Sequence, residues 1–252
     1  AEYAHGLQGE VERNAFKLRG ILTGIDVKSY DPATDPALFA PYSAENPAGK
    51  AVCKAELQKM LGLPVREDVP VVAMISRLVA HKGLDLVRAA IEELLADDVQ
   101  FVLLGTGDSE YESYFKDLAN RYKGKVVSII AFNGDLSRKI YSGADIFLMP
   151  SKSEPCGLSQ MIASRYLTVP VVRETGGLYD SIKPYGAGGN GFTFAAYNAG
   201  DMLYVLREAV SLYKNKPEWQ KLMIKAGTTD FSWQRSAEEY KKLYTDTLAL
   251  LK

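Results

Sequence analysis

The sequence predicts an α/β fold in which helices cover both faces of a parallel sheet, the doubly wound arrangement. Two observations carry this prediction: short apolar runs recur along the chain, and stretches with apolar residues at helical spacing separate them. Strands of a parallel sheet are buried on both faces, so they read as nearly continuous apolar segments of this kind. The predicted strands are residues 70–76, 100–105, 126–132, 145–150 and 169–173, with a sixth at 189–195.

Helical stretches connect these strands in order. Residues 1–50 are rich in Pro, Asp and Gly without a sustained period, so we expect a connector that adds nothing to the core. A terminal helix is expected over 237–252, with an apolar stripe on one side. The other predicted helices are residues 83–96, 109–122, 136–144, 157–167, 199–215 and 218–227.

The composition narrows the class of protein. The chain has 252 residues, 47% of them hydrophobic, and a formal net charge of -1, so no basic excess points to a nucleic-acid partner. No apolar run approaches the ~20 residues of a membrane-spanning helix, so no membrane partner is expected either. Two cysteines, Cys53 and Cys156, and two histidines provide neither a disulfide framework nor a metal-ligand cluster.

The amino terminus suggests a cytoplasmic protein that is one piece of a longer polypeptide. The first residues are polar and mixed in charge, which is unlike a signal peptide. The sequence begins at Ala1, without Met, in what reads as the middle of a helical or irregular segment.

The loops that follow the predicted strands carry the candidate functional residues. In a parallel sheet these loops meet at one edge, where α/β proteins bind ligands. Arg77 and Lys82 follow the first strand, Phe132 ends the third, and Glu154 follows the fourth. Helix amino termini together with Arg and Lys suit a diphosphate, a Phe ring can stack on a base, and a carboxylate can accept hydrogen bonds from sugar hydroxyls. The set predicts a nucleotide-sugar site.

Each of these residues also has a purely structural interpretation. Arg77 and Lys82 taken alone are most simply solvated loop charges, and Phe132 taken alone is most simply a core residue. Glu154 could instead stabilise the amino terminus of the next helix. Cys156 is better explained as a small apolar residue than as a nucleophile, since no histidine lies near it in the sequence. Only their joint placement at one edge favours function.

Several segments resemble the carboxyl-terminal half of bacterial glycogen synthases and plant starch synthases. The resemblance runs over nearly the whole chain in order, and it is carried by "SRLVAHKGLDL", "LLGTGD", "GADIFLMPSKSEPCGLSQ", "TVPVVRETGGLYDSI" and "DFSWQRSAEEY". It implies the GT-B architecture, in which two Rossmann-like domains face each other across a cleft. Residues 1–50 would then be a remnant of the amino-terminal domain with the interdomain connector, 51–230 the donor-binding domain, and 231–252 a helix returning toward the missing domain.

The resemblance also implies a reaction and a role for each candidate residue. The reaction would be metal-independent transfer of glucose from ADP-glucose to the nonreducing end of an α-1,4-glucan, with retention of configuration and without a cofactor. Arg77 and Lys82 would bind the donor diphosphate, and Glu154 would position the donor glucose. The remaining members of the implied site are Phe132 against the base, Cys156 and Gly157 in the sugar pocket, and the N–H groups of Leu158 and Ser159 on phosphate.

Two other functions stay open at this stage. One is a noncatalytic nucleotide-sugar-binding or glucan-associated module, because the isolated chain lacks the amino-terminal half and is expected to be inactive. The other is a nicotinamide dehydrogenase, which is disfavoured because the loop after the first strand has one glycine, Gly83, and no Gly-x-Gly-x-x-Gly turn. The residues alone leave ADP-glucose and UDP-glucose both open, and a plant protein of this family would be plastidial.

Overall fold

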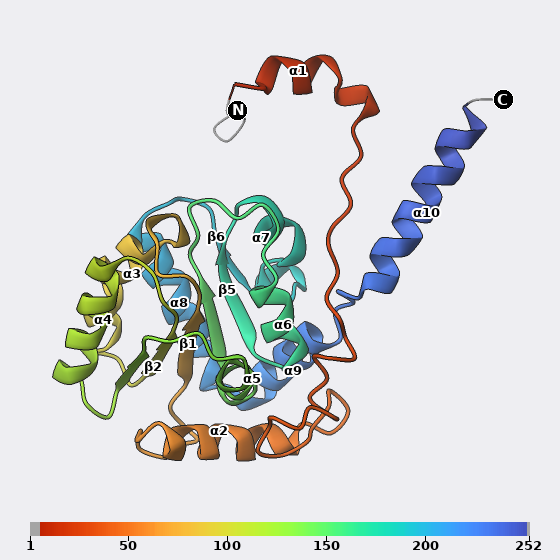
Figure 1. Ribbon diagram of the computed structural model, residues 1–252. Coiled ribbons are helices and arrows are strands. Elements are labelled where there is room, and N and C mark those ends of the chain that lie inside the picture. Colours follow the sequence, from red (N-terminus) through yellow and green to blue (C-terminus); the bar gives the residue numbers. More distant parts are fainter. Residues whose placement is uncertain (1–5, 251–252) are drawn as a thin grey trace.

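The computed structural model describes residues 6–250, and six parallel strands form its single sheet in the order β3-β2-β1-β4-β5-β6 (Figure 1). Residues 1–5 of the expected connector and 251–252 of the expected terminal helix lie outside the described residues. The doubly wound α/β prediction is confirmed. The strands are β1 Val71–Ile75, β2 Gln100–Leu104, β3 Val126–Ile129, β4 Ile146–Met149, β5 Val169–Arg173 and β6 Phe192–Phe194.

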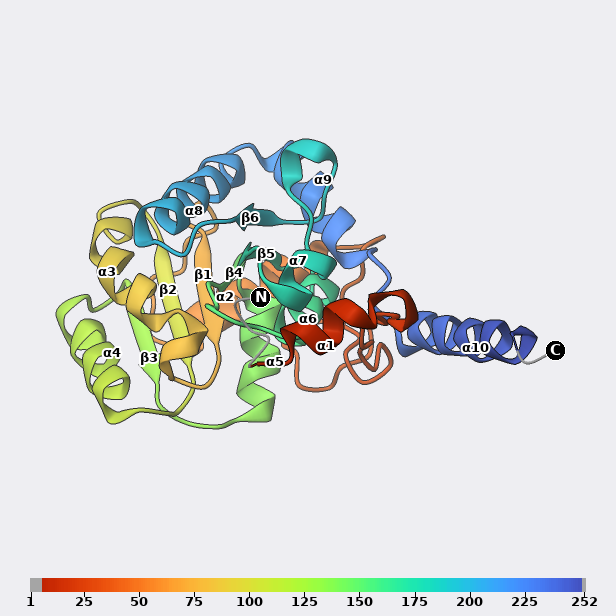
Figure 2. The same cartoon turned by 90° about the horizontal axis from the view of Figure 1, so that it is seen from above.

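Helices cover both faces of the sheet (Figure 2). Because successive side chains of a strand point to opposite faces, Val72 and Met74 of β1 pack in one core cluster and Val71 and Ala73 in the other. The first cluster is covered by α3 Leu84–Leu94, α4 Ser109–Arg121 and α8 Ala199–Tyr213. The second is covered by α2 Ala48–Met60, α5 Gly134–Gly143, α6 Ser159–Arg165 and α7 Gly176–Ser181. The remaining helices are α1 Gln8–Arg13, α9 Lys216–Gly227 and α10 Trp233–Ala249, with short 3₁₀ turns at Ala15–Lys17, Ala80–Lys82 and Tyr185–Ala187.

The structure corrects two predicted boundaries and adds two helices. The third strand ends at Ile129, three residues before Phe132, because the chain must bend into the loop before α5. The terminal helix begins at Trp233, since the hydroxyl of Ser232 accepts a hydrogen bond from the N–H of Arg235 and so caps the helix. Helices α2 and α7 were not predicted, and α7 is a short helix that opens on two glycines.

The connector also contributes to the core, contrary to expectation. Ile25 and Tyr42 are both buried in the cluster on the α5 and α6 face. The hydroxyl of Tyr42 donates a hydrogen bond of 2.9 Å to the carbonyl of Tyr166, which follows α6. This part of the chain is therefore packed onto the sheet domain, and α2 begins within it, before residue 50.

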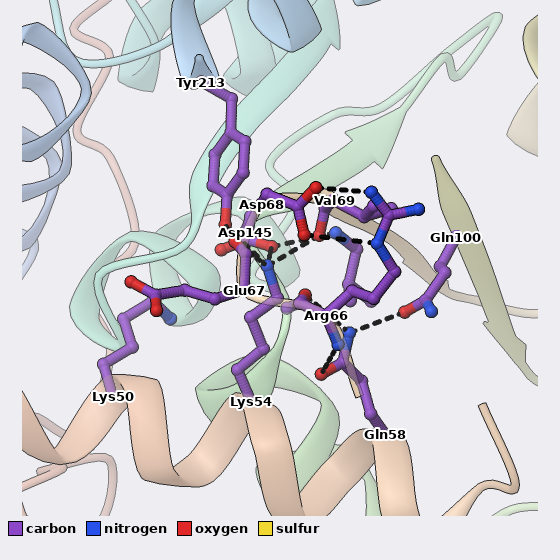
Figure 3. A network of polar contacts seen from close by, with 12 residues as sticks. Lys50, Lys54, Gln58, Arg66, Glu67, Asp68, Val69, Gln100, Asp145 and Tyr213 are labelled. Atoms are coloured by element: carbon purple, nitrogen blue, oxygen red, sulfur yellow. Dashed lines mark hydrogen bonds and ion pairs between the residues drawn. The ribbon is translucent and has the colours of Figure 1, made fainter. Parts of the chain in front are cut away.

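Helix α2 lies across the amino ends of the strands and is fixed there by buried polar side chains (Figures 1 and 3). Lys50, Lys54 and Gln58, spaced by four residues, project from the same face of the helix. The ammonium of Lys54 lies 2.8 Å from the carboxylate of Asp145, just before β4, and also donates to the carbonyl of Val69, just before β1. Since both partners of this ion pair are buried and hydrogen-bonded, they fix the register between α2 and the sheet.

Within residues 6–250, no carboxylate is recorded in direct contact with the buried ammonium of Lys50. Its ammonium donates to the carbonyls of Ser142 and Tyr166, at 3.0 and 2.9 Å, and to the hydroxyl of Thr168 at 2.8 Å. Burial lowers the pKa of Lys50 to about 7, against the smaller opposing influence of Asp145. Lys50 therefore joins α2 to the ends of α5 and α6 through neutral acceptors.

Helix α10 projects away from the sheet domain (Figure 1). It leaves the domain beside the connector, where the N–H of Ile25 donates to the carbonyl of Phe231 and the hydroxyl of Ser236 donates to the carbonyl of Leu22. Apolar side chains along α10 are exposed, among them Tyr240, Tyr244 and Leu248. No helix within residues 6–250 combines the length and the apolar character needed to cross a membrane.

The lowered pKa of Lys50 predicts a pH dependence of stability. Between its folded pKa of about 7 and its ordinary value of 10.5, the unfolded chain holds a proton that the folded chain has released. The free energy of unfolding should therefore rise with pH above 7, by at most about 1.4 kcal/mol per pH unit from this residue. Denaturant unfolding at pH 7, 8 and 9 should show that Lys50→Met removes this rise. Equal slopes in the two proteins would contradict the prediction.

Candidate active site

The carboxyl ends of β1 and β4 form the centre of the candidate site. These strands are neighbours, with Val72 paired to Ile146, yet the helices that follow them pack on opposite faces of the sheet. The chain after β1 enters α3 on one face, and the chain after β4 enters α6 on the other. A crevice opens between two loops that diverge in this way, and ligands of open α/β sheets bind there.

Two backbone contacts hold these loops against each other. Gly83 has a φ of +78°, and a Cβ at this position would lie 2.1 Å from the carbonyl oxygen of Pro150. Only glycine allows that approach. The N–H of Lys152 donates a hydrogen bond of 2.9 Å to the carbonyl of His81. Lys82, between these contacts, is thereby brought to the loop that carries Glu154.

A cavity of about 180 Å³ lies at this point and collects most of the predicted site. Six of the eight predicted residues line it: Arg77, Lys82, Glu154, Gly157, Leu158 and Ser159. The other lining residues are Met74, Ile75, Ser76, Leu148, Met149 and Ser151. The floor of the cavity is thus formed by the ends of β1 and β4, and its walls by the two loops.

The central interaction in the cavity is an ion pair between Lys82 and Glu154. The ammonium nitrogen lies 2.5 Å from Oε2, and the two side chains are only 16% and 10% exposed. Ser151 donates a longer hydrogen bond, 3.4 Å, to the same oxygen. Helix α6 has no side-chain cap hydrogen bond at its amino terminus, so the contact recorded for the carboxylate of Glu154 is with Lys82 and Ser151 rather than with the helix backbone.

The turn that carries Glu154 rests on α7. The N–H of Gly177 donates to the carbonyl of Glu154 at 3.1 Å. Gly176 has a φ of +47°, and a Cβ there would lie 2.2 Å from the same carbonyl oxygen. Gly157 also has positive φ, +71°, which turns the chain from Glu154 toward α6. Glycines therefore set the conformation on both sides of this contact.

Phe132 and Cys156 do not line the cavity. Phe132 lies in the loop after β3 at the same edge of the sheet, with 97% of its surface exposed, so its interpretation as a core residue is wrong. A fully exposed aromatic ring at a ligand-binding edge is available for stacking. Cys156 is half-buried, and its thiol lies near the carbonyl of its neighbour Gly157. Arg77 is exposed at the mouth of the cavity.

The arrangement can bind an anion and a polyhydroxylated group side by side. Arg77 and Lys82 offer positive charge with N–H donors, and Glu154 offers acceptor oxygens. Ser151, which sequence reasoning missed, supplies a buried hydroxyl next to Glu154. Its signal was a polar residue placed directly at the end of an apolar strand.

Comparison with known proteins identifies a matching family and similar sequences. The family described as "Glycosyl transferases group 1" matches residues 59–230. The chain is 50% identical over 250 residues to the glycogen synthase of Kosmotoga olearia, and this match covers 98% of the chain and 52% of that protein. It is 46% identical over 245 residues to the glycogen synthase of Bacillus cereus strain Q1, with 96% and 52% covered. The chain therefore spans about half the length of the curated relatives it matches.

Solved structures support the fold. The catalytic domain of starch synthase IV from Arabidopsis thaliana, bound to ADP and acarbose, superimposes with a TM-score of 0.91 at 38% identity, over 99% of this chain and 53% of that one. A sucrose-phosphate synthase from Thermosynechococcus elongatus superimposes with a TM-score of 0.67 at 20% identity, covering 96% and 56%. The second likeness concerns the fold alone.

The close approach at Gly176 predicts a position that does not tolerate a side chain. Gly176→Ala places a Cβ against the carbonyl of Glu154 at positive φ, so the free energy of unfolding should fall by more than ~1 kcal/mol. Gly134→Ala is the matched control, because a Cβ at Gly134 meets nothing within 4 Å and its φ is not in the left-handed range. Denaturant unfolding measures both. A loss no larger at Gly176 than at Gly134 would refute the prediction.

Proposed function

This chain belongs to the glycosyl transferases group 1 family, and we propose that it is the carboxyl-terminal, donor-binding half of a glycogen or starch synthase. The complete enzyme transfers glucose from ADP-glucose to the nonreducing end of an α-1,4-glucan, with retention of configuration and without a metal ion or cofactor. The similarity of this chain to proteins called glycogen synthase and to a starch synthase bound to ADP and acarbose supports this assignment.

The observation that carries the proposal is the Lys82–Glu154 pair inside the cavity. An ammonium group has three hydrogens, and Glu154 takes one of them, so Lys82 has donors left for phosphate oxygens. Glu154 in turn has a second carboxylate oxygen for the hydroxyls of the donor glucose. One contact pair thus spans the junction between sugar and diphosphate, which is the bond that the reaction breaks.

The chemistry fits these roles. As the glycosidic bond breaks, positive charge develops on the sugar ring and negative charge on the departing diphosphate. Arg77 and Lys82 stabilise the diphosphate where its charge increases, while Glu154 lies on the sugar side. A hydrolase would need a second carboxylate beside Glu154. The position checked for it, eight residues further on in α6, is the apolar and buried Ile162, so a hydrolase is disfavoured.

The other predicted site residues contact the remaining parts of the donor. The exposed ring of Phe132 stacks on the adenine, and Cys156 and Gly157 border the sugar. The N–H groups of Leu158 and Ser159 bind phosphate oxygens. These three roles come from the family resemblance, and the position of the loops at one edge of the sheet is compatible with them.

The proposed enzyme needs a second domain, which supplies the acceptor side of the cleft. The exposed apolar side chains of α10 offer a surface for it, as expected of a helix that returns toward an amino-terminal domain. The glucan acceptor binds between the two domains. The proposed setting is the cytoplasm of a bacterium, or a plastid for a plant protein.

The first prediction from this proposal concerns the isolated chain. It should bind ADP and ADP-glucose, because the donor loops are present, but it should not lengthen a glucan. Isothermal titration and incorporation of labelled glucose into glycogen measure the two properties. Steady incorporation would contradict the need for a second domain. Binding of NADH, followed by its fluorescence, with no binding of ADP-glucose would favour the dehydrogenase alternative.

The second prediction concerns Glu154→Gln in the full-length polypeptide. The change keeps the shape and one acceptor but removes the charge beside the developing positive sugar, so kcat should fall tenfold or more, about 1.4 kcal/mol. Affinity for ADP, which lacks the glucose that Glu154 is proposed to contact, should stay within about threefold. Unaltered kcat would remove Glu154 from the reaction. Retained activity of the wild type in excess EDTA is the accompanying test of the metal-free mechanism.

A further inference from the structure

Gln160 lies directly behind the turn that carries Glu154. It is the second residue of α6 and is fully buried. Its amide nitrogen donates to two successive carbonyls of the turn, those of Cys156 at 3.2 Å and Gly157 at 2.9 Å. The same nitrogen lies 3.0 Å from the hydroxyl oxygen of Ser181 in α7. One buried side chain thus connects the turn, α6 and α7.

These bonds determine where the turn directs its N–H groups. In a trans peptide the C=O and the following N–H point in opposite directions. Because Gln160 captures the carbonyls of Cys156 and Gly157, the N–H groups of Gly157 and Leu158 point away from Gln160. Both residues line the cavity, whereas Gln160 does not. Within residues 6–250 no acceptor is recorded for either N–H group.

The amide oxygen of Gln160 is a second, independent observation. Oε1 is buried and has no hydrogen-bond partner within the described part of the chain. Exchanging the amide oxygen and nitrogen would place the oxygen against two carbonyls, so the network fixes the orientation. A buried acceptor without a partner lowers stability, and such groups in native proteins call for an explanation. Here the amide orientation that leaves Oε1 unpaired is also the one that lets the amide nitrogen donate to both carbonyls of the turn.

The turn is also tightly packed against this amide. A Cβ at Gly157 would lie 2.6 Å from Oε1 of Gln160 and 3.1 Å from Cγ of Glu154. Gly157 is therefore enclosed between the amide and the candidate sugar-binding carboxylate. The hydroxyl of Ser181 donates to the carbonyl of Gly177, whose own N–H holds the carbonyl of Glu154. The hydrogen bonds run from Gln160 through Ser181 and Gly177 back to the Glu154 turn.

We propose that Gln160 is a positioning residue of the donor site, which orients the 154–158 turn so that the carboxylate of Glu154 and the N–H groups of Gly157 and Leu158 face the nucleotide-sugar. The inference rests on the proposed function. It adds to it a residue that touches no ligand and acts only through the turn.

The test compares Gln160→Met with Gln58→Met in this chain, using ADP-glucose as the probe. Gln58 is the matched control, because it is a buried glutamine with its own hydrogen bonds to Arg66 and Gln100, at the opposite edge of the sheet. Titration should show the Kd for ADP-glucose raised tenfold or more by Gln160→Met and by less than twofold by Gln58→Met. Thermal midpoints should fall in both variants, which separates the site effect from general destabilisation.

Two results overturn the inference. A Kd within twofold of wild type for Gln160→Met, or equal losses in the two variants, overturns it while leaving the proposed function intact. A wild-type chain that binds neither ADP nor ADP-glucose overturns the proposed function and this inference together. If Gln160→Met does not fold, Ser181→Ala decides in its place: a roughly threefold rise in Kd supports the positioning role, and an unchanged Kd refutes it.

Discussion

The reversal of strand order between β1 and β4 is the constraint on which the rest of the candidate site depends. Two adjacent parallel strands send their following helices to opposite faces, so the loops separate and leave room at the sheet edge. Gly83 then lets α3 begin against Pro150. Without both features Lys82 and Glu154, 72 positions apart in the sequence, would not meet. The ion pair is a result of topology more than of local sequence.

Each edge of the sheet contains a lysine next to a carboxylate, with different consequences. At the amino edge, Lys54 contacts Asp145 and also the carbonyl of Val69 and the hydroxyl of Tyr213, so its hydrogens are used within the protein. That pair serves the packing of α2. At the carboxyl edge, the partner recorded for Lys82 within residues 6–250 is Glu154, beside a cavity. The same chemical pair is thus structural at one edge and suited to a ligand at the other.

The sequence predicted the strands well, because strands that are buried on both faces consist mainly of apolar residues. Apolar runs marked strands β1 to β5, and the charged and aromatic residues in the loops after them marked the edge where the candidate site lies. Helix α2 escaped prediction because its inward face carries Lys50, Lys54 and Gln58, polar residues that conceal the usual apolar period. Six of the eight predicted site residues line one cavity, whereas neither Ser151 nor Gln160 was singled out from the sequence. Their importance comes from hydrogen bonds to other segments, which spacing along the chain does not reveal.

The connector and the start of α10 lie side by side, joined through Ile25 and Phe231 and through Leu22 and Ser236. The chain therefore enters and leaves the sheet domain at one place. Gly24 allows this, because a Cβ there would lie 2.4 Å from the backbone nitrogen of Trp233. Domains with adjacent ends can be transplanted into a loop of another protein without stretching the host. The two ends of residues 24–232 accordingly have the spacing that insertion into a loop of another protein requires.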